Sequence, residues 1–296
     1  MKIFRFRDRV GILDERSQHF LKTVAWLGGY VTPEQAQELG IRNSVTRVHV
    51  QLKDLESWGF IKPVSAYPAI YQVTKSVTRL LGADLSARRE HTLETIRTRL
   101  LTVNFYLEAI RWPAKFVLDH KQKISKLFEA VAEPALLPYR GSKVYLWQDL
   151  IFQRPSGEVI FTMVDHFGRH PYRQLYRHLK RFAPILGPDD LRLMIVVSSE
   201  DREQLFRRKL NDARLQRLLE QQGLDLPLKD MMTIYRVRRA VPVVRPLITN
   251  RQQLRELRAR RLANQELSDG QQQTRDVIHN NGTYTNTDIS GEKGGV

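Results

Sequence analysis

The chain has 296 residues, no cysteine, and a formal net charge of +16 from 48 Lys and Arg against 32 Asp and Glu. This length is enough for two domains with hydrophobic cores, and the positive charge favours a polyanionic partner, nucleic acid first and an anionic membrane surface second. The lack of cysteine excludes disulfides and thiolate metal sites. No apolar run approaches the ~20 residues of a membrane span, and the N-terminus has no signal-peptide core. A cytoplasmic protein without a membrane role is therefore expected.

Residues 13–73 are predicted to form three helices followed by a two-stranded hairpin. The first helix has an apolar stripe at three- and four-residue steps, made by Phe20, Leu21, Val24 and Leu27. Thr32 and Pro33 are typical of a helix start, and Gly40 ends this second, short helix. A third helix begins with Asn43 or Ser44 as its cap and ends at Gly59. Strands are predicted at 60–64 and 69–73. This order of elements indicates a winged helix-turn-helix.

The third helix is interpreted as a recognition helix in the major groove of DNA. Its buried side is predicted to carry Val45, Val48, Leu52 and Leu55, and its opposite side Arg47, Gln51 and Asp54, with Thr46, Val50 and Lys53 beside them. Arg and Gln are side chains that reach base edges. The predicted DNA-binding residues of this module are Arg42, Asn43, Ser44, Thr46, Arg47, Gln51, Lys53 and Lys62. A winged helix used only for protein contact is the alternative.

A long helix is predicted at 86–111. Its apolar residues are spaced three, four, three, four and three apart: Leu93, Ile96, Leu100, Val103, Leu107 and Ile110. This heptad spacing permits a coiled coil in a homodimer. The interpretation favoured here is a core helix that lies on a sheet.

The rest of the chain alternates strands and helices. Strands are predicted at 115–118, 144–153, 158–165, 191–198 and 232–237, and helices at 172–183, 200–222 and, rich in arginine, 252–267. Residues from 268 onward are polar and are predicted to be a disordered tail. The expected fold is therefore α+β, with a mixed sheet like that of a restriction-endonuclease-like core. The predicted domains are 1–84, 85–249, 250–267 and 268–296.

Two acids are placed where a restriction-endonuclease-like core holds its metal. Asp149 lies on the first strand of the predicted central hairpin and Asp165 at the end of the second. Carboxylates are the ligands that Mg²⁺ or Mn²⁺ would need beside a phosphate. The lysine that usually follows the second acid is missing, and Lys180 on the next helix is the nearest substitute. No cofactor is expected unless this domain is active, and its activity is expected to be lost.

The helix at 172–183 permits a second catalytic interpretation. Tyr172, Tyr176 and Lys180 are four residues apart on one face, and tyrosines of this kind attack a DNA phosphate in relaxases. The simpler interpretation is a basic helix that contacts the phosphate backbone through Arg173, Arg177, Lys180 and Arg181.

The segments RVHVQLKDLESWGFIKP and YQVTKSVTRLL, then His91 at the long helix and Val164-Asp165 before the basic helix, carry a family resemblance. In these segments the chain resembles the replication-relaxation family of plasmid and integrative-element proteins. The resemblance implies a winged helix joined by a long helix to a degenerate nuclease-like domain. It also implies a kinship to mobilisation relaxases, which cut DNA.

The expected function is sequence-specific binding of double-stranded DNA by a protein of a bacterial mobile element, acting in plasmid replication, in mobilisation as part of a relaxosome, or in their transcriptional control. One alternative is a metal-dependent DNA nickase or relaxase. The other is a scaffold that joins relaxase, replication or conjugation proteins.

Overall fold

The structure is a computed structural model that describes residues 5–81, 91–130, 135, 137, 139–140, 143–144, 150–166, 168, 171–190, 192–221, 223 and 226–244. It mixes helices and strands, as predicted, and its larger sheet combines parallel and antiparallel pairs. Among these residues, none of the helices is both long and apolar enough to cross a bilayer. The predicted basic helix at 252–267 and the predicted tail lie outside the described residues.

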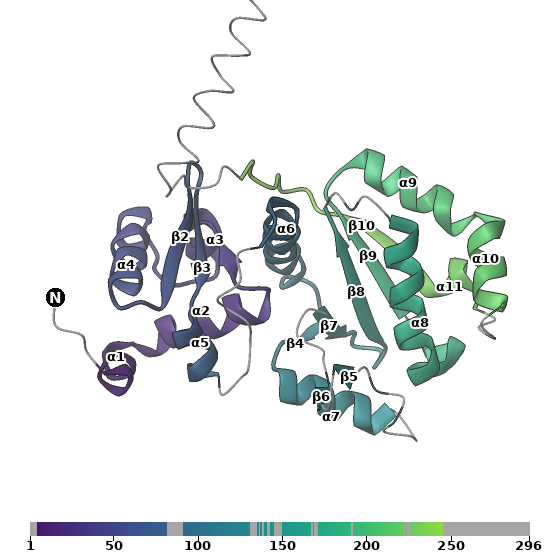
Figure 1. Ribbon diagram of the computed structural model, residues 1–296, viewed down its shortest axis with the longest axis horizontal. Coiled ribbons are helices and arrows are strands. Elements are labelled where there is room, and N and C mark those ends of the chain that lie inside the picture. The colour runs from purple at the N-terminus through teal and green to yellow at the C-terminus, as the bar shows by residue number, and fades with distance from the viewer. Residues whose placement is uncertain are drawn as a thin grey trace, which may run out of the picture. The chain divides into compact units, whose positions relative to one another are not determined.

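The N-terminal part consists of five helices and three short strands (Figure 1). In chain order these are α1 (Phe6–Ile12), α2 (Glu15–Trp26), β1 (Tyr30–Val31), α3 (Pro33–Glu38), α4 (Val45–Ser57), β2 (Ile61–Ala66), β3 (Ala69–Val73) and α5 (Lys75–Leu80). The strands form an antiparallel sheet in the order β1-β3-β2. Helix α1 and strand β1 were not predicted from the sequence. Helices α2, α3 and α4 and strands β2 and β3 lie where the apolar spacing and the glycines placed them.

Side-chain caps fix where α2, α3 and α4 begin. The Asp14 carboxylate accepts the Ser17 N–H at the start of α2. Thr32 and Gln35 form a reciprocal capping box at the start of α3. Ser44 accepts the Arg47 N–H at the start of α4. Each cap satisfies an amide that has no partner inside its own helix, and of the two candidates for α4, Ser44 is the cap.

Helix α6 (Leu93–Ala109) is the long helix, and it is buried on nearly all sides in its second half. The predicted seam is interrupted at both ends, where Leu93 is 39% and Ile110 52% exposed. Its side chains pack on the larger sheet in one cluster with Phe152, Met194 and Val196. The interpretation as a core helix is confirmed, whereas the dimer stays a prediction.

Buried hydrogen bonds tie α3 to α6. The Gln35 amide donates to the Leu100 carbonyl over 3.0 Å and to the Asn104 side chain over 2.7 Å. Asn104 in turn donates to the Ala240 carbonyl over 3.3 Å. Residues 1–246 accordingly form one compact unit. The expected boundary at 84/85 falls outside the described residues and stays a prediction.

The larger sheet has five strands in the order β10-β9-β8-β7-β4. They are β4 (Lys115–Val117), β7 (Leu150–Gln153), β8 (Val159–Asp165), β9 (Arg192–Val197) and β10 (Met232–Arg236). Strands β8, β9 and β10 pair in parallel, and β7 pairs antiparallel with both β8 and β4. A small separate sheet is formed by β5 (Tyr139–Arg140) and β6 (Lys143–Val144). Strand β6 and β7 replace the single strand predicted at 144–153, whose residues 145–149 lie outside the described part.

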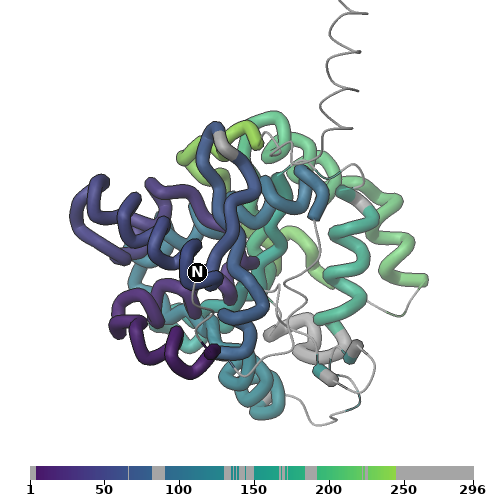
Figure 2. The backbone as a smooth tube through the Cα atoms, turned by 60° about the vertical axis from the view of Figure 1, so that its left-hand side comes forward, coloured from purple at the N-terminus to yellow at the C-terminus, as the bar shows by residue number. Residues whose placement is uncertain are grey.

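Helices cover both faces of this sheet (Figures 1 and 2). One face packs against α7 (His120–Ala130), α8 (Pro171–Asp190), α9 (Glu200–Leu210) and α10 (Ala213–Glu220), while a short α11 (Leu228–Met231) leads into β10. The other face packs against α6. Along β9, Ile195 belongs to the first cluster and Val196 to the second, which is the alternation of a strand covered on both sides.

Two predicted helix boundaries are wrong. The helix expected to end before Pro184 continues as α8 to Asp190, because an internal proline removes one backbone hydrogen bond without removing its neighbours. The single helix expected at 200–222 is two helices. Asn211 ends α9, and the Asp212 side chain accepts the Arg214 N–H to begin α10.

Candidate nucleic-acid interface and neighbouring cavity

The outer side of α4 is the first candidate site. Val48, Leu52 and Leu55 are buried, as predicted, and α4 packs against α3 and β2. Thr46, Arg47, His49, Val50 and Lys53 are exposed. Thr46, Val50 and Lys53 follow each other at four- and three-residue steps, so they lie on one side of the helix. The part of α4 that carries Thr46, Arg47, Val50 and Lys53 is therefore open among the residues that the structure describes.

Two predictions about α4 are wrong. Val45 was expected in the core and is 58% exposed, because it is the first residue of the helix and lies beyond the reach of the core. Gln51 was expected to reach bases and is 8% exposed. Gln51 lies three residues after Val48 and next to Leu52, so it is on the buried side of α4. Its amide oxygen accepts a hydrogen bond inside the protein.

Arg42 is the partner that allows Gln51 to be buried. Its guanidinium donates to Gln51 Oε1 over 2.5 Å, to the Asp14 carboxylate over 2.7 Å and to the Ile41 carbonyl over 2.7 Å. A guanidinium with three internal acceptors has little capacity left for DNA. The predicted DNA contact by Arg42 is therefore replaced by a structural role, while Asn43 and Ser44 remain exposed.

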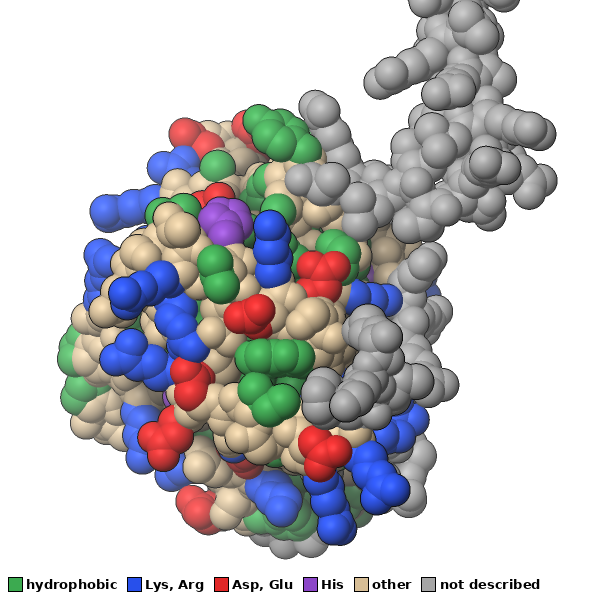
Figure 3. All heavy atoms as spheres, turned by 90° about the vertical axis from the view of Figure 1, so that its left-hand side faces the viewer, with side chains coloured by type: hydrophobic (Ala, Val, Ile, Leu, Met, Phe, Trp, Pro, Cys, Tyr) green, Lys and Arg blue, Asp and Glu red, His purple; other side chains and the backbone are tan. Residues whose placement is uncertain are grey.

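The hairpin β2–β3 lies beside α4. Its tip carries Tyr67, which is 76% exposed, and Lys62 on β2 is half-buried. The exposed hydrophobic side chains of Val45 and Tyr67 were missed as surface features by the sequence reasoning, although an aromatic residue at the tip of a hairpin does signal contact. Figure 3 shows this side of the molecule. Basic side chains are interspersed there with hydrophobic and acidic ones, so the face is not uniformly positive.

Of the two predicted metal ligands, the structure describes only Asp165. Asp149 lies outside the described residues. Asp165 is 2% exposed: one oxygen accepts the Gly168 N–H over 2.9 Å, and the other accepts Nε of Arg202 over 2.9 Å. A metal ion would have to displace Arg202 from this carboxylate. The described residues also contain no group of three His, Asp or Glu side chains placed to hold a metal ion.

The polar side chains of α8 point in different directions. Tyr176 packs against the core cluster of the sheet, and Lys180 and Arg173 are exposed. Nothing is described of the Tyr172 side chain. Arg177 is also exposed, and Arg177 and Arg181 both line a cavity that also reaches Asp165. Three of the four predicted basic residues are therefore exposed, and two of the four line the cavity.

Two arginines at the end of β10 and just after it are paired with acidic side chains. Arg236 bonds Glu200 over 2.9 Å and lies 3.6 Å from Glu203. Arg239 forms an ion pair with Glu38 on α3, which holds the pKa of Arg239 above its ordinary value. These pairs reduce the charge that this region offers to phosphates.

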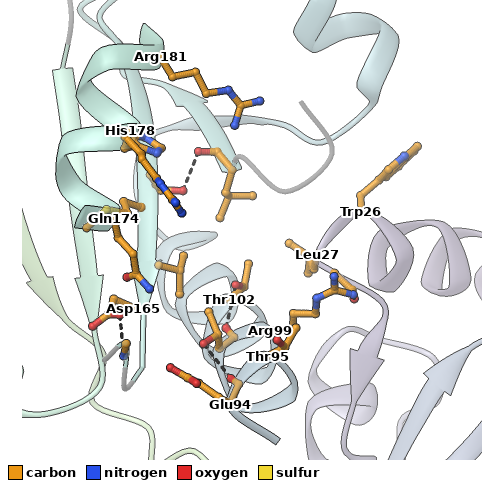
Figure 4. A pocket seen from close by; sticks show the side chains of 18 residues that line it. Trp26, Leu27, Glu94, Thr95, Arg99, Thr102, Asp165, Gln174, His178 and Arg181 are labelled. Atoms are coloured by element: carbon orange, nitrogen blue, oxygen red, sulfur yellow. Dashed lines mark hydrogen bonds between the residues drawn. The ribbon is translucent and has the colours of Figure 1, made fainter. Parts of the chain in front are cut away.

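The cavity of about 570 Å³ lies among the end of α2, α6, β8 and α8 (Figure 4). Its polar lining comes from Glu94, Thr95, Thr98, Arg99, Thr102, Thr162, Asp165, Gln174, Arg177, His178 and Arg181. Burial, and then the charge of Arg181, lower the pKa of His178 to about 3. His178 is therefore neutral at physiological pH. Its Nε2 has no hydrogen-bond partner among the described residues.

In comparisons with known proteins, no family model, no curated protein and no solved structure matches the chain.

Proposed function

We propose that this protein binds double-stranded DNA in a sequence-specific manner through α4, with residues 13–73 acting as a winged helix-turn-helix. The observation that carries the proposal is the open side of α4. Arg47 and Thr46 offer hydrogen-bond donors to base edges, and Val50 offers a methyl surface to thymine. The net charge of +16 favours a nucleic-acid partner.

The hairpin completes the proposed interface. In this arrangement α4 enters the major groove, and Tyr67 at the tip of the hairpin and Lys62 on β2 approach the sugar–phosphate backbone beside it. Lys53 contacts a phosphate. In the family that the sequence resembles, such a protein belongs to a plasmid or integrative element. We propose the same setting here, in replication, mobilisation or their transcriptional control.

Selection from a pool of randomised duplexes, followed by fluorescence anisotropy on the selected site, tests this proposal. Arg47→Ala is expected to weaken binding to the selected site by about 1–3 kcal/mol and to change binding to random DNA much less. Arg207→Ala, an exposed arginine on α9, is the matched control and is expected to leave both affinities unchanged. If no sequence is enriched, or if Arg47→Ala weakens both duplexes equally, α4 does not read bases.

Lys53→Ala separates phosphate contacts from base contacts in the same assay. It is expected to weaken binding to the selected and the random duplex alike, and to reduce the slope of log affinity against log salt by about 1. An interaction that does not depend on salt favours the scaffold alternative.

The enzymatic alternative receives less support from the same residues. It requires Asp165 to be available to a metal ion, whereas Arg202 and the Gly168 amide occupy both oxygens. Incubation of the protein with supercoiled plasmid carrying the selected site and Mg²⁺ or Mn²⁺ tests it directly. Nicking that disappears in Asp165→Asn would replace the proposal of a binding protein by that of a nickase.

A further inference from the structure

Residues 237–244 follow β10 and lead from the larger sheet back to the N-terminal part. We call them the β10 extension. Figures 1 and 2 both show this segment, the yellow-green end of the coloured chain, passing α6 and ending beside the hairpin β2–β3. The end of the β10 extension therefore lies next to an element of the proposed DNA interface.

Polar contacts hold the first half of the β10 extension. The Glu108 carboxylate on α6 accepts the backbone N–H groups of Arg238 and Arg239, each over 3.0 Å. The side chain of Arg239 pairs with Glu38 on α3. The β10 extension is thereby attached both to α6 and to the N-terminal part.

The last residue of the β10 extension is held by hydrophobic packing. Val244 is 3% exposed and belongs to one cluster with Tyr30 on β1, Ile70 on β3 and Leu100 on α6. Val64 on β2 packs against the same cluster. Because Val244 is buried in a cluster that includes both strands of the hairpin, the point from which the chain continues is fixed beside this hairpin.

The sequence that follows Val244 becomes strongly basic. Residues 251–261, which we call the arginine-rich segment, contain one acid, Glu256, and five arginines. These arginines are Arg251, Arg255, Arg258, Arg260 and Arg261. The arginine-rich segment lies outside the described residues, but Arg251 follows Val244 by only seven residues. Seven residues span at most about 23 Å, which is less than the roughly 34 Å of one turn of duplex DNA.

We propose that the arginine-rich segment binds the phosphate backbone of duplex DNA on the hairpin side of the site that α4 reads. This inference rests on the DNA contact proposed for α4. The arginines add affinity without adding sequence preference, because the phosphates are the same at every base pair. The protein is therefore expected to contact more DNA on one side of its site than on the other.

Two duplexes test this asymmetry with the full chain. Each contains the site selected with the full chain, extended on one side only by about one turn of unrelated sequence, and a third duplex has no extension. For a symmetric site, a single half-site is used. One extension, and not the other, is expected to raise the affinity by about 10-fold or more at low salt, measured by fluorescence anisotropy.

Tyr67→Cys identifies the hairpin side of the site. The chain contains no cysteine and Tyr67 is 76% exposed, so an iron chelate attached to this single thiol cleaves the DNA that lies near the tip of the hairpin. Cleavage is expected on the side whose extension raises the affinity. Cleavage only on the opposite side would overturn the proposal.

A variant with four substitutions removes most of the charge of the arginine-rich segment. It combines Arg255→Gln, Arg258→Gln, Arg260→Gln and Arg261→Gln. This variant is expected to lose the affinity gained from the extension, and to reduce the slope of log affinity against log salt on the extended duplex by about 2–4. Its preference for the selected over a random sequence is expected to stay unchanged.

The matched control variant removes four exposed arginines from α9 and α10. It combines Arg207→Gln, Arg208→Gln, Arg214→Gln and Arg217→Gln. The control variant is expected to keep the affinity gained from the extension, since these helices pack on the face of the larger sheet opposite to α6. Loss of the gain in both variants would show that overall charge, and not the arginine-rich segment, is responsible, and would overturn the proposal.

This proposal and the proposal for α4 fail in different ways. If the selected site is bound but the two extensions change its affinity equally or not at all, the arginine-rich segment does not contact the flanking DNA, and the proposal for α4 is unaffected. If no sequence is selected, the proposal for α4 fails and this one fails with it.

Discussion

The guanidinium of Arg202 and the carboxylate of Asp165 form a buried ion pair, in which Nε donates to Oδ2 over 2.9 Å. The two side chains are only 12% and 2% exposed. Removing one partner of such a pair leaves a buried charge without compensation. We expect Arg202→Ala to lower the free energy of unfolding by about 3–5 kcal/mol, measured by urea denaturation.

Arg207, on the same helix as Arg202, provides the control for this prediction. It pairs with Glu203 over 2.8 Å but is 62% exposed. Arg207→Ala is expected to cost less than about 1 kcal/mol, because water screens an exposed pair. Equal, small losses in the two variants would mean that Asp165 does not need Arg202, and would reopen the possibility of a metal ion at this carboxylate.

Gln51 is expected to contribute to stability and not to base recognition. Gln51→Ala removes the acceptor that Arg42 bonds over 2.5 Å inside the protein, and is expected to lower the free energy of unfolding by about 1–3 kcal/mol. DNA affinity, measured where both variants are folded, is expected to change little. Thr46→Ala, on the exposed side of α4, is expected to show the reverse pattern, with a stability change within about 0.5 kcal/mol. A specific loss of DNA affinity in Gln51→Ala alone would contradict the internal role.

Alanine substitutions at Gly28 and Gly40 distinguish the cost of backbone strain from the cost of steric contact. Both have positive φ angles, +110° and +81°, which side chains other than glycine adopt at a cost. A Cβ at Gly28 would lie 2.8 Å from Cγ of Arg99, whereas a Cβ at Gly40 has no heavy atom within 4 Å. Gly40→Ala is expected to cost about 1–2 kcal/mol from φ alone.

The larger effect is therefore expected at Gly28. Gly28→Ala adds the displacement of Arg99 to the cost of the backbone, and is expected to lower the midpoint of thermal unfolding further than Gly40→Ala does. Equal midpoints of thermal unfolding for the two variants would show that Arg99 can move aside without lowering the stability.

The pH dependence of stability is expected to contain a contribution from His178. Its pKa is about 3 in the folded protein, lowered from 6.5 by burial and then by the charge of Arg181. Below pH 6.5 the unfolded chain takes up a proton at this residue that the folded protein does not. The free energy of unfolding therefore decreases by about 1.4 kcal/mol for each pH unit from 6.5 down toward 3.

Urea denaturation at pH 7.5, 6.0, 5.0 and 4.5 measures this contribution. His178→Gln is expected to lose stability less steeply than the unsubstituted protein as the pH falls below 6.5. His49→Gln, on the exposed side of α4, is expected to leave the slope unchanged. If His178→Gln follows the same curve as the unsubstituted protein, a proton reaches His178 in the folded state near its ordinary pKa.

Local signals in the sequence were sufficient for most of the element order. The spacing of Phe20, Leu21 and Val24 identified α2, and Thr32 before Pro33 placed the start of α3 where its capping box lies. The mixture of parallel and antiparallel strands in the larger sheet was also expected from the alternation of strands and helices, whereas the order of its strands was not predicted. These features depend on neighbours within about one or two helical turns, which a single sequence contains.

The errors concern residues whose environment is set by distant parts of the chain. Gln51 looked like a surface residue because its partner Arg42 lies outside the helix and closes the contact from the preceding loop. Asp165 looked like a metal ligand because Arg202, 37 residues later, was not recognised as its partner. The cavity could not be predicted at all, since its lining joins α2, α6, β8 and α8, which only the tertiary structure brings together.

The bonds that Gln35 makes to Leu100 and Asn104 have a practical consequence for anyone who transplants this module. A fragment that ends after residue 81 would lack α6 and would expose the Gln35 amide to water. It would also expose Leu27, which is 2% exposed in the full chain and packs with the α6 cluster. Chimaeras that exchange the proposed DNA-reading part should therefore carry α6 along with it, so that the graft keeps its own supporting surface.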